Sequence, residues 1–219
     1  MTEIIEVKTK KQRKEFVEYP LRLYKGNPYF VPPLYGDEMK MFTEKNVYYK
    51  TCDSVFYLAQ RGGKTVGRIQ GIIQKQYNGI HGASQVRFTR FDCENDENTA
   101  KLLFNAVENW GKTKGMTEIV GPLGYSDLER EGLLIEGFDY LCTFEEQYNY
   151  AYYPLLVEAC GYEKDVDWLE SRLYKMKENP ERLERLFERS LQRYNLHIGG
   201  VGLKKGAYIK NMHKGFSIA

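Results

Sequence analysis

The stretch that decides the fold runs from residue 85 to residue 121 and reads QVRFTRFDCENDENTAKLLFNAVENWGKTKGMTEIVG. Gln85 to Phe91 alternates two unlike sets of side chains, which predicts a strand. From about Glu97 to Lys114 apolar residues recur at helical spacing, and Gly115 supplies a left-handed stop. Glu118 to Gly121 predicts a second, short strand. Because the strand, helix and strand follow one another with brief links, we expect parallel strands joined by a right-handed crossover.

The composition fits one ordinary soluble domain with a short appendage. The 219 residues include 32 Lys and Arg against 30 Asp and Glu, a formal net charge of +2. This balance gives no global field that would indicate nucleic acid or an anionic membrane as a partner. No apolar run approaches the roughly 20 residues of a spanning helix, and Met1 to Lys10 lacks a signal-peptide core. We therefore expect a cytoplasmic protein with no nucleic-acid partner and no membrane partner.

The cysteines and histidines do not predict a metal site. The four cysteines are far apart, and the three histidines lie in distant segments. None of these spacings matches a zinc knuckle or a redox pair, so four reduced thiols are the simplest interpretation.

The N-terminal part predicts a strand, helices and an extended belt. Ile4 to Val7 is typical of a strand, and Lys11 to Tyr19 of a helix. Pro20 is expected to interrupt that helix, with a second short helix continuing through Tyr24. Gly26 to Leu34 holds three prolines among aromatic and apolar residues, which predicts an extended segment packed around the domain.

A hairpin is expected next. Ser54 to Arg61 and Thr65 to Gln74 are rich in Val, Ile, Phe and Tyr, and Gly62-Gly63-Lys64 separates them as a short turn. The two segments should be antiparallel neighbours. A turn around Asn78 would then lead into Gln85 to Phe91.

The C-terminal half predicts a long connection and further elements. Gly121 to Gln147 is too long for an ordinary link and rich in acids, so function could reside there. A helix is expected from about Tyr152 to Gly161, and strand material over Asp165 to Tyr174.

The predicted domains are residues 1–176 and a C-terminal extension of residues 177–219. Asn179 and Pro180 predict the start of a helix with an apolar stripe. Ile198 to Leu203 followed by Lys204 to Ala219 is typical of a strand leading into a helix. This repeats the opening of the chain, so we expect a longer natural chain to continue into a second related domain.

Three stretches of sequence carry a resemblance to a known family. They are Gly121-Pro122-Leu123-Gly124-Tyr125-Ser126, Gly132-Leu133-Leu134-Ile135-Glu136-Gly137-Phe138-Asp139 and Asn149-Tyr150-Ala151-Tyr152-Tyr153-Pro154. With the order of elements over roughly residues 1–176, they resemble a bacterial branch of the GNAT (Gcn5-related N-acetyltransferase) superfamily. The resemblance implies an α+β fold: a mixed, mostly antiparallel sheet with a splayed pair of parallel strands, and helices on both faces.

The resemblance also implies a cofactor site for acetyl-CoA or another acyl-CoA. An unpaired strand edge can hydrogen-bond the pantetheine arm, and the N–H groups that begin the next helix can bind the pyrophosphate. The residues implied to hold the cofactor are Phe88, Thr89, Arg90, Phe91, Asn98 and Thr99. The loop Glu94 to Thr99 departs from the family pattern, because it has neither glycine nor cation. Its acids are better interpreted as helix caps.

The catalytic candidates are two tyrosines and two glutamates. Tyr152 and Tyr153 lie near the place of the family's tyrosine acid, which falls on Val157 here, and the alternative is that they pack the helix against the long segment. Glu131 and Glu136 are candidate general bases, because partial burial would raise their proton affinity; the alternative is that they are solvated surface groups. Tyr125, Ser126 and Asn149 are the expected substrate contacts.

The leading hypothesis is a GNAT-like acyltransferase that moves an acetyl or acyl group from acyl-CoA to an amine of a small molecule or peptide. The alternative is a non-catalytic GNAT-fold module that binds a ligand or protein and has a degenerate pyrophosphate loop. A third hypothesis is half of a tandem arrangement, or a homodimer, which exposed apolar residues on Glu181 to Asn195 would favour.

Overall fold

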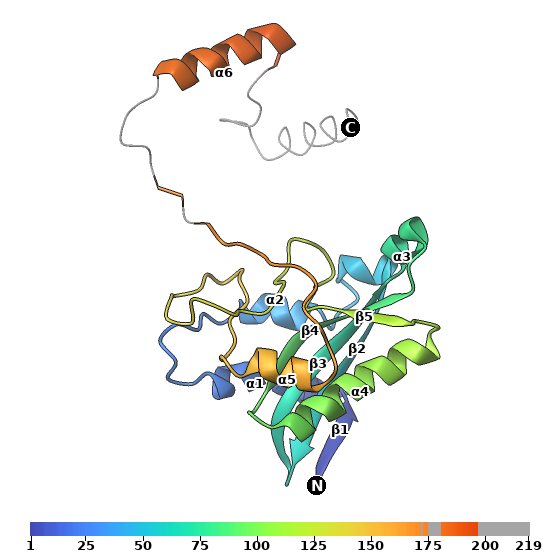
Figure 1. Cartoon of the computed structure of the whole chain (residues 1–219). Coiled ribbons are helices and arrows are strands. Elements are labelled where there is room, and N and C mark those ends of the chain that lie inside the picture. The colour runs from blue at the N-terminus through green and yellow to red at the C-terminus, as the bar shows by residue number, and fades with distance from the viewer. Residues whose placement is uncertain (172, 175–180, 197–219) are drawn as a thin grey trace. The chain divides into compact units, whose positions relative to one another are not determined.

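The computed structural model describes residues 1–171, 173–174 and 181–196. It divides the chain into two units, Met1–Trp168 and Leu169–Ala219, which are described separately (Figure 1). The predicted division at residues 176 and 177 stays a prediction.

The Met1–Trp168 unit is built on a five-stranded sheet of strand order β1-β2-β3-β4-β5 (Figure 1). The strands are β1 (Thr2–Glu6), β2 (Cys52–Arg61), β3 (Lys64–Gln74), β4 (Gln85–Cys93) and β5 (Glu118–Val120). Neighbours from β1 to β4 are antiparallel, and β4 pairs with β5 in parallel. Only Gln85 to Arg87 of β4 have partners on β5. The predicted α+β fold, with its mostly antiparallel sheet and diverging parallel pair, is confirmed.

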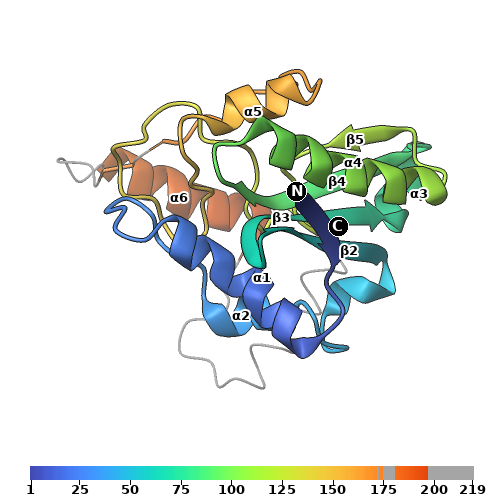
Figure 2. The same cartoon turned by 90° about the horizontal axis from the view of Figure 1, so that it is seen from below.

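Helices cover both faces of this sheet (Figure 2). They are α1 (Lys10–Leu23), α2 (Tyr35–Lys40), α3 (Lys75–His81), α4 (Glu97–Thr113) and α5 (Tyr153–Ala159), with a 3-10 turn over Val47–Lys50. Figures 1 and 2 show α1 and α2 on one face and α4 and α5 on the other. Leu103 and Phe104 of α4 are buried in the larger core cluster, and Phe16 of α1 in a smaller one.

Helix α1 continues through Pro20, so the expected interruption is wrong. Proline lacks the N–H that would bond the carbonyl four residues earlier, which leaves the Phe16 oxygen without its helical donor. The Arg68 side chain fills that place, because its Nη1 donates to the Phe16 oxygen at 2.8 Å. A side chain from β3 thus keeps α1 continuous across its proline.

The segment around Asn78 forms a short helix rather than the expected turn. The Gln74 side chain accepts the Tyr77 N–H and caps α3. Gly82, with φ of 62°, ends the helix in the left-handed conformation that glycine adopts without strain. The side-chain cap and the terminal glycine therefore stabilise this seven-residue helix enough to offset the destabilising effect of Gly79 inside it.

Asp165 to Tyr174 contains no strand among its described residues, so that expectation is wrong. The side chains of Leu169 and Leu173 are 91% and 92% exposed, so they do not pack on a sheet face. Apolar residues without an adjacent strand edge do not form a strand.

The described part of the Leu169–Ala219 unit contains helix α6 (Glu181–Tyr194). Its apolar residues Leu183, Leu186 and Phe187 are about half exposed. The expected strand and helix over Ile198 to Ala219 lie outside the described residues, and the predicted homodimer stays a prediction.

The helices of the described residues include none that is both long enough and apolar enough to cross a membrane.

Candidate functional site

A bulge in β4 marks the centre of the candidate site. Arg68 pairs with Asp92 across the sheet, whereas Gln70 pairs with Thr89, so two β4 residues face one residue of β3. One of these two β4 residues, Arg90, has a φ of 47°, which is uncommon for a residue with a Cβ. Bulges bend a strand and redirect its side chains, and they are frequent beside functional sites.

The bulge turns the Arg90 side chain into a buried ion pair. Its Nε lies 3.1 Å from Oε2 of Glu38 on α2, and its Nη2 lies 3.0 Å from Oε1. Nη1 donates to the Gln70 side chain at 2.9 Å, and Glu129 lies 3.5 Å away. Burial opposes ionisation of Glu38, yet the Arg90 charge prevails and lowers the pKa of Glu38 below its usual value.

A second buried pair lies beside the first. Nε of Arg68 donates to Oδ2 of Asp92 at 2.8 Å, and both side chains are about 95% buried. Oδ1 of Asp92 faces the hydroxyls of Tyr24 at 3.0 Å and Tyr153 at 3.2 Å. Buried charges need such partners, because an unpaired charge in the protein interior is very costly.

These two pairs line a cavity of about 30 Å³ that the long segment after Gly121 closes. Its polar lining includes Glu38, Arg68, Thr89, Arg90, Asp92, Arg130 and Gln147. Phe30, Pro33 and Tyr148 supply part of the apolar wall. Burial lowers the pKa of Arg130 below its usual range, but an arginine so shifted remains a cation at neutral pH.

Both predicted catalytic tyrosines bond the backbone of Cys93. The Tyr152 hydroxyl donates to the Cys93 oxygen at 2.8 Å, and the Tyr153 hydroxyl accepts the Cys93 N–H at 3.1 Å. Burial raises the pKa of both hydroxyls, and the Asp92 carboxylate raises that of Tyr153 further. Each hydroxyl holds its proton strongly and bonds the backbone at the end of β4, and the alternative that these tyrosines pack the helix against the long segment stays a prediction.

The structure does not bring the predicted bases to the tyrosines. Glu131 is half-buried, and burial raises its pKa, while Glu136 is exposed. Among the described residues, no hydrogen bond or ion pair joins Glu131 or Glu136 to Tyr152 or Tyr153. The catalytic assignment of all four residues stays a prediction.

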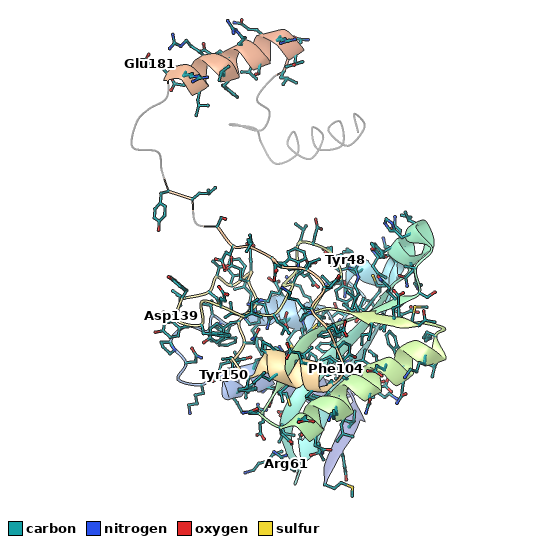
Figure 3. The ribbon with its side chains drawn as sticks, viewed as in Figure 1. Tyr48, Arg61, Phe104, Asp139, Tyr150 and Glu181 are labelled. Atoms are coloured by element: carbon teal, nitrogen blue, oxygen red, sulfur yellow. The ribbon has the colours of Figure 1, made fainter. Side chains whose placement is uncertain are left out.

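The predicted substrate contacts use their polar atoms within the protein. The Tyr125 hydroxyl lies 2.7 Å from the Ser54 hydroxyl and accepts from Gln70 at 2.9 Å. Ser126 bonds the Tyr48 hydroxyl at 2.9 Å, and the Tyr48 ring, labelled in Figure 3, stacks on Tyr125. Asn149 is fully buried and pins the long segment through the backbone N–H and oxygen of Leu134. These residues order the walls of the site, and their binding role stays a prediction.

The residues implied to hold a cofactor fall into two groups. Phe88 and Phe91 pack on Phe104 of α4, with ring centroids 5.0 and 4.8 Å apart, while Thr89 and Arg90 face the cavity. Asn98 and Thr99 lie in the first turn of α4, where both bond the side chain of Asp96. The two groups therefore do not form one surface for a single ligand.

The start of α4 does not fit a pyrophosphate. Oδ1 of Asp96 accepts the Asn98 N–H at 3.2 Å, so the helix carries its own negative cap. Arg61, labelled in Figure 3, is already paired with Glu94 at 2.6 Å and with Asp96 at 2.7 Å. The Thr99 hydroxyl and Arg61 hold the pKa of Asp96 below its usual value, so the cap is ionised. A second anion here would meet like charge instead of free donors.

The diverging edge of β4 also has internal partners. The Phe88 oxygen accepts the Leu123 N–H at 2.9 Å, and Tyr152 and Tyr153 occupy the oxygen and N–H of Cys93. A Cβ on Gly121 would collide with the Phe88 oxygen, so the chain that leaves β5 lies directly against β4. The chain's own groups therefore occupy part of the edge that the resemblance assigns to the pantetheine arm.

The sequence patterns do not predict the buried charged residues that line the cavity. Arg68 and Asp92 lie on strands that carry several other polar residues, and Glu38 lies in a helix that was not predicted. A polar residue on a buried strand face is the signal that could have indicated the first pair.

Comparisons with known proteins identify two relatives. The chain is 32% identical over 190 residues to a "Bacterial ceramide synthase" from Caulobacter vibrioides (strain NA1000 / CB15N), covering 86% of this chain and 50% of that protein. It is 30% identical over 160 residues to "Protein YghO" from Escherichia coli (strain K12), covering 73% of this chain and 41% of that protein. The chain thus spans half or less of the length of these curated relatives. No protein-family model matches it.

Solved structures give distant matches. The glucosamine-6-phosphate N-acetyltransferase from Arabidopsis thaliana matches with a TM-score of 0.47 and 12% identity, covering 80% of this chain and 99% of that one. A tandem GNAT protein from the clavulanic acid biosynthesis pathway matches with a TM-score of 0.48 and 12% identity, covering 74% and 43%. In its own strand order, parallel β4–β5 pair and intervening helix α4, the Met1–Trp168 unit has a GNAT-like fold.

Proposed function

We propose that the chain acts in amide-forming acyl transfer, which joins an acyl group to the amine of a small molecule. The observation that carries this proposal is the 32% identity over 190 residues to a bacterial ceramide synthase. A ceramide is an N-acylated long-chain amino alcohol, so a synthase that forms it joins an acyl group to an amine. The GNAT-like fold agrees with the same class of reaction.

The proposed acceptor is an amino alcohol or another small amine, and the proposed acyl donor is an acyl-CoA. The start of α4 carries its own negative cap, so the diphosphate of that donor is not assigned to it. The proposed location is the cytoplasm.

The test is an acyl-transfer assay of the purified chain. Acetyl-CoA and a long-chain acyl-CoA are each mixed with a long-chain amino alcohol, an amino acid and a short peptide. Free thiol and the mass of the amide product are then measured. We expect amide formation with at least one acceptor. Folded protein that forms no amide with any pair would contradict the proposal.

The second candidate is a binding module without acyl transfer. The self-capped start of α4 and the tyrosine hydroxyls on Cys93 favour it, because they remove the family's usual contacts with the cofactor. A calorimetric titration with free CoA, acetyl-CoA and a longer acyl-CoA distinguishes the two candidates. The module predicts no binding, whereas the transferase predicts binding of the acyl donor.

A Glu97→Gln variant makes this titration sharper. Glu97 is exposed in the first turn of α4, so its neutral replacement reduces the negative charge near any bound diphosphate. If the donor does not use this helix start, the variant and the natural chain bind it equally. Tighter binding by the variant would contradict the description of the α4 start as closed.

A further inference from the structure

One arginine that lines the cavity beside the β4 bulge, Arg130, has no ion pair among the described residues. Three guanidinium groups line this cavity, from Arg68, Arg90 and Arg130, against the two carboxylates of Glu38 and Asp92. Arg68 pairs with Asp92 at 2.8 Å, and Arg90 pairs with Glu38 at 3.0 Å and with Glu129 at 3.5 Å. Arg130 remains, and among the described residues no carboxylate lies within ion-pair distance of it.

Arg130 is fixed in position by backbone oxygens. Its Nε and Nη2 donate to the Phe144 oxygen at 3.1 and 2.5 Å, and Nη2 also lies 3.4 Å from the Val31 oxygen. Carbonyl oxygens orient a guanidinium but do not neutralise it. Nη1 has no hydrogen-bond partner within the part of the chain that the structure describes, so one donor of this guanidinium is left for a ligand.

Thr89 supplies a second donor to the same cavity. It is 97% buried on β4, because its exposed fraction is 3%, and it belongs to the cavity lining. Its hydroxyl has no hydrogen-bond partner in the described ranges. A hydroxyl without a partner on a cavity wall can bond a polar ligand atom in that cavity.

We propose that this cavity binds the carboxylate of a small organic acid, with Arg130 and Thr89 as its hydrogen-bond donors. An arginine beside an oxyanion forms strong, charge-assisted hydrogen bonds. The volume of about 30 Å³ suits roughly two water-sized groups, which matches two carboxylate oxygens better than the four oxygens of phosphate. Phe30 and Pro33 provide apolar wall for the carbon chain next to the carboxylate.

This inference concerns binding alone and does not rest on the proposed acyl transfer. A failed transfer assay leaves it standing, and a failed binding test leaves the transfer proposal standing.

The test is a calorimetric titration of the full chain with sodium butyrate at constant ionic strength. Butyramide, which has the same shape without the charge, and sodium phosphate are titrated in parallel. We expect butyrate to bind at least about tenfold more tightly than either, since one charge-assisted hydrogen bond contributes about that factor. Equal binding of butyramide, or no binding of butyrate, would overturn the proposal. Phosphate as tight as butyrate would overturn the choice of a carboxylate.

Variants of Arg130 and Thr89 test whether these two residues are the donors that bind butyrate. Arg130→Gln should weaken butyrate about tenfold and Thr89→Val about threefold, while Arg130→Lys, which keeps the charge, should retain most of the affinity. Arg189→Gln on exposed α6 makes the same charge change elsewhere and should bind as the natural chain does. Unchanged affinity in Arg130→Gln would overturn the assignment. If that variant does not fold, the butyrate and butyramide comparison on the natural chain still decides.

Discussion

The start of α4 and the β4 bulge lie close together in the sequence, but the charged groups around them differ in whether they leave room for an anion. At the helix start the chain provides its own anion, because Asp96 caps the first turn and Arg61 is already paired with Glu94 and Asp96. Near the bulge, Arg130 has no ion pair among the described residues, where carbonyl oxygens hold its guanidinium. The start of α4, where the resemblance predicts an anion site, therefore repels a second anion, whereas the cavity has an arginine that can bind one.

The comparison shows that a helix N-terminus does not by itself make an anion site. Its N–H groups attract a negative group, but a carboxylate from the same chain satisfies them at no translational cost. A guanidinium on a cavity wall keeps its charge when only carbonyl oxygens hold it. Which groups remain unsatisfied, and not which element they lie on, decides where a ligand can bind.

Tyr153 joins the two regions. Its hydroxyl contacts the Cys93 N–H, three residues before the Asp96 cap, and Oδ1 of Asp92 on the cavity wall. The Tyr24 hydroxyl lies 2.8 Å from it. Single substitutions in each region separate their contributions to the free energy of unfolding.

The largest effect is expected for Arg68→Met. The change leaves the Asp92 carboxylate buried without its cation and removes the donor to the Phe16 oxygen beside Pro20. Breaking one side of a buried pair costs about 3–5 kcal/mol, so chemical denaturation should show a loss of that size in the free energy of unfolding. Lys75→Met, which breaks an exposed pair with Asp53, should cost less than about 1 kcal/mol. Equal losses in both variants would contradict the buried pair.

Tyr153→Phe should have the next largest effect. It removes the hydroxyl that faces Cys93 N–H, Asp92 and Tyr24, and leaves those groups less well satisfied in the core. The expected loss in the free energy of unfolding is about 2 kcal/mol, within the range for a buried group that loses its partner. Tyr77→Phe, at a partly exposed tyrosine on α3, is the control and should change stability little. If Tyr153→Phe is as stable as the natural chain, the hydroxyl has no structural role and the catalytic interpretation gains support.

Glu38→Gln tests the ion pair at the bulge and its pH dependence. Because the pKa of Glu38 is lowered in the folded chain, its ionised form stabilises the fold above the unfolded value of 4.5. That stability is lost as the pH falls through the lower folded pKa. The natural chain should exceed the variant by about 1.5 kcal/mol at neutral pH, and the difference should shrink below about pH 4.5. A difference that stays constant down to pH 3 would show that Glu38 is not the titrating partner of Arg90.

The sequence predicts the parts of this molecule that local patterns specify. The helical spacing of Leu103, Phe104 and Val107, and the left-handed stop at Gly115, were sufficient to define α4. The acids before α4 were correctly interpreted as caps, because capping depends on only a few neighbouring residues.

The parts that the sequence did not predict depend on contacts between distant residues. Pro20 alone predicts a break in α1, and only the Arg68 side chain, far along the chain, removes the reason for one. The bulge at Arg90 requires the register of β3 against β4. The lack of an ion pair at Arg130 among the described residues requires knowing that Glu38, Asp92 and Glu129 already pair with other arginines. The spacing of residues along the sequence does not indicate which distant side chains pair in the folded chain.

The smallest effect is expected for Asp96→Ala, which removes the cap of α4. The loss of a capping carboxylate costs about 1 kcal/mol in the free energy of unfolding, since the N–H of Asn98 loses its acceptor. The variant also removes one partner of Arg61 and frees the helix start for an added anion. If the cap is what closes this site, sodium sulfate should stabilise the variant more than the natural chain, with sodium chloride of equal ionic strength as the control. Equal stabilisation of both proteins would show that Glu94 and Glu97 repel anions even without the Asp96 cap. The α4 start and the cavity would then differ in the charge of the surrounding side chains and not in helix capping.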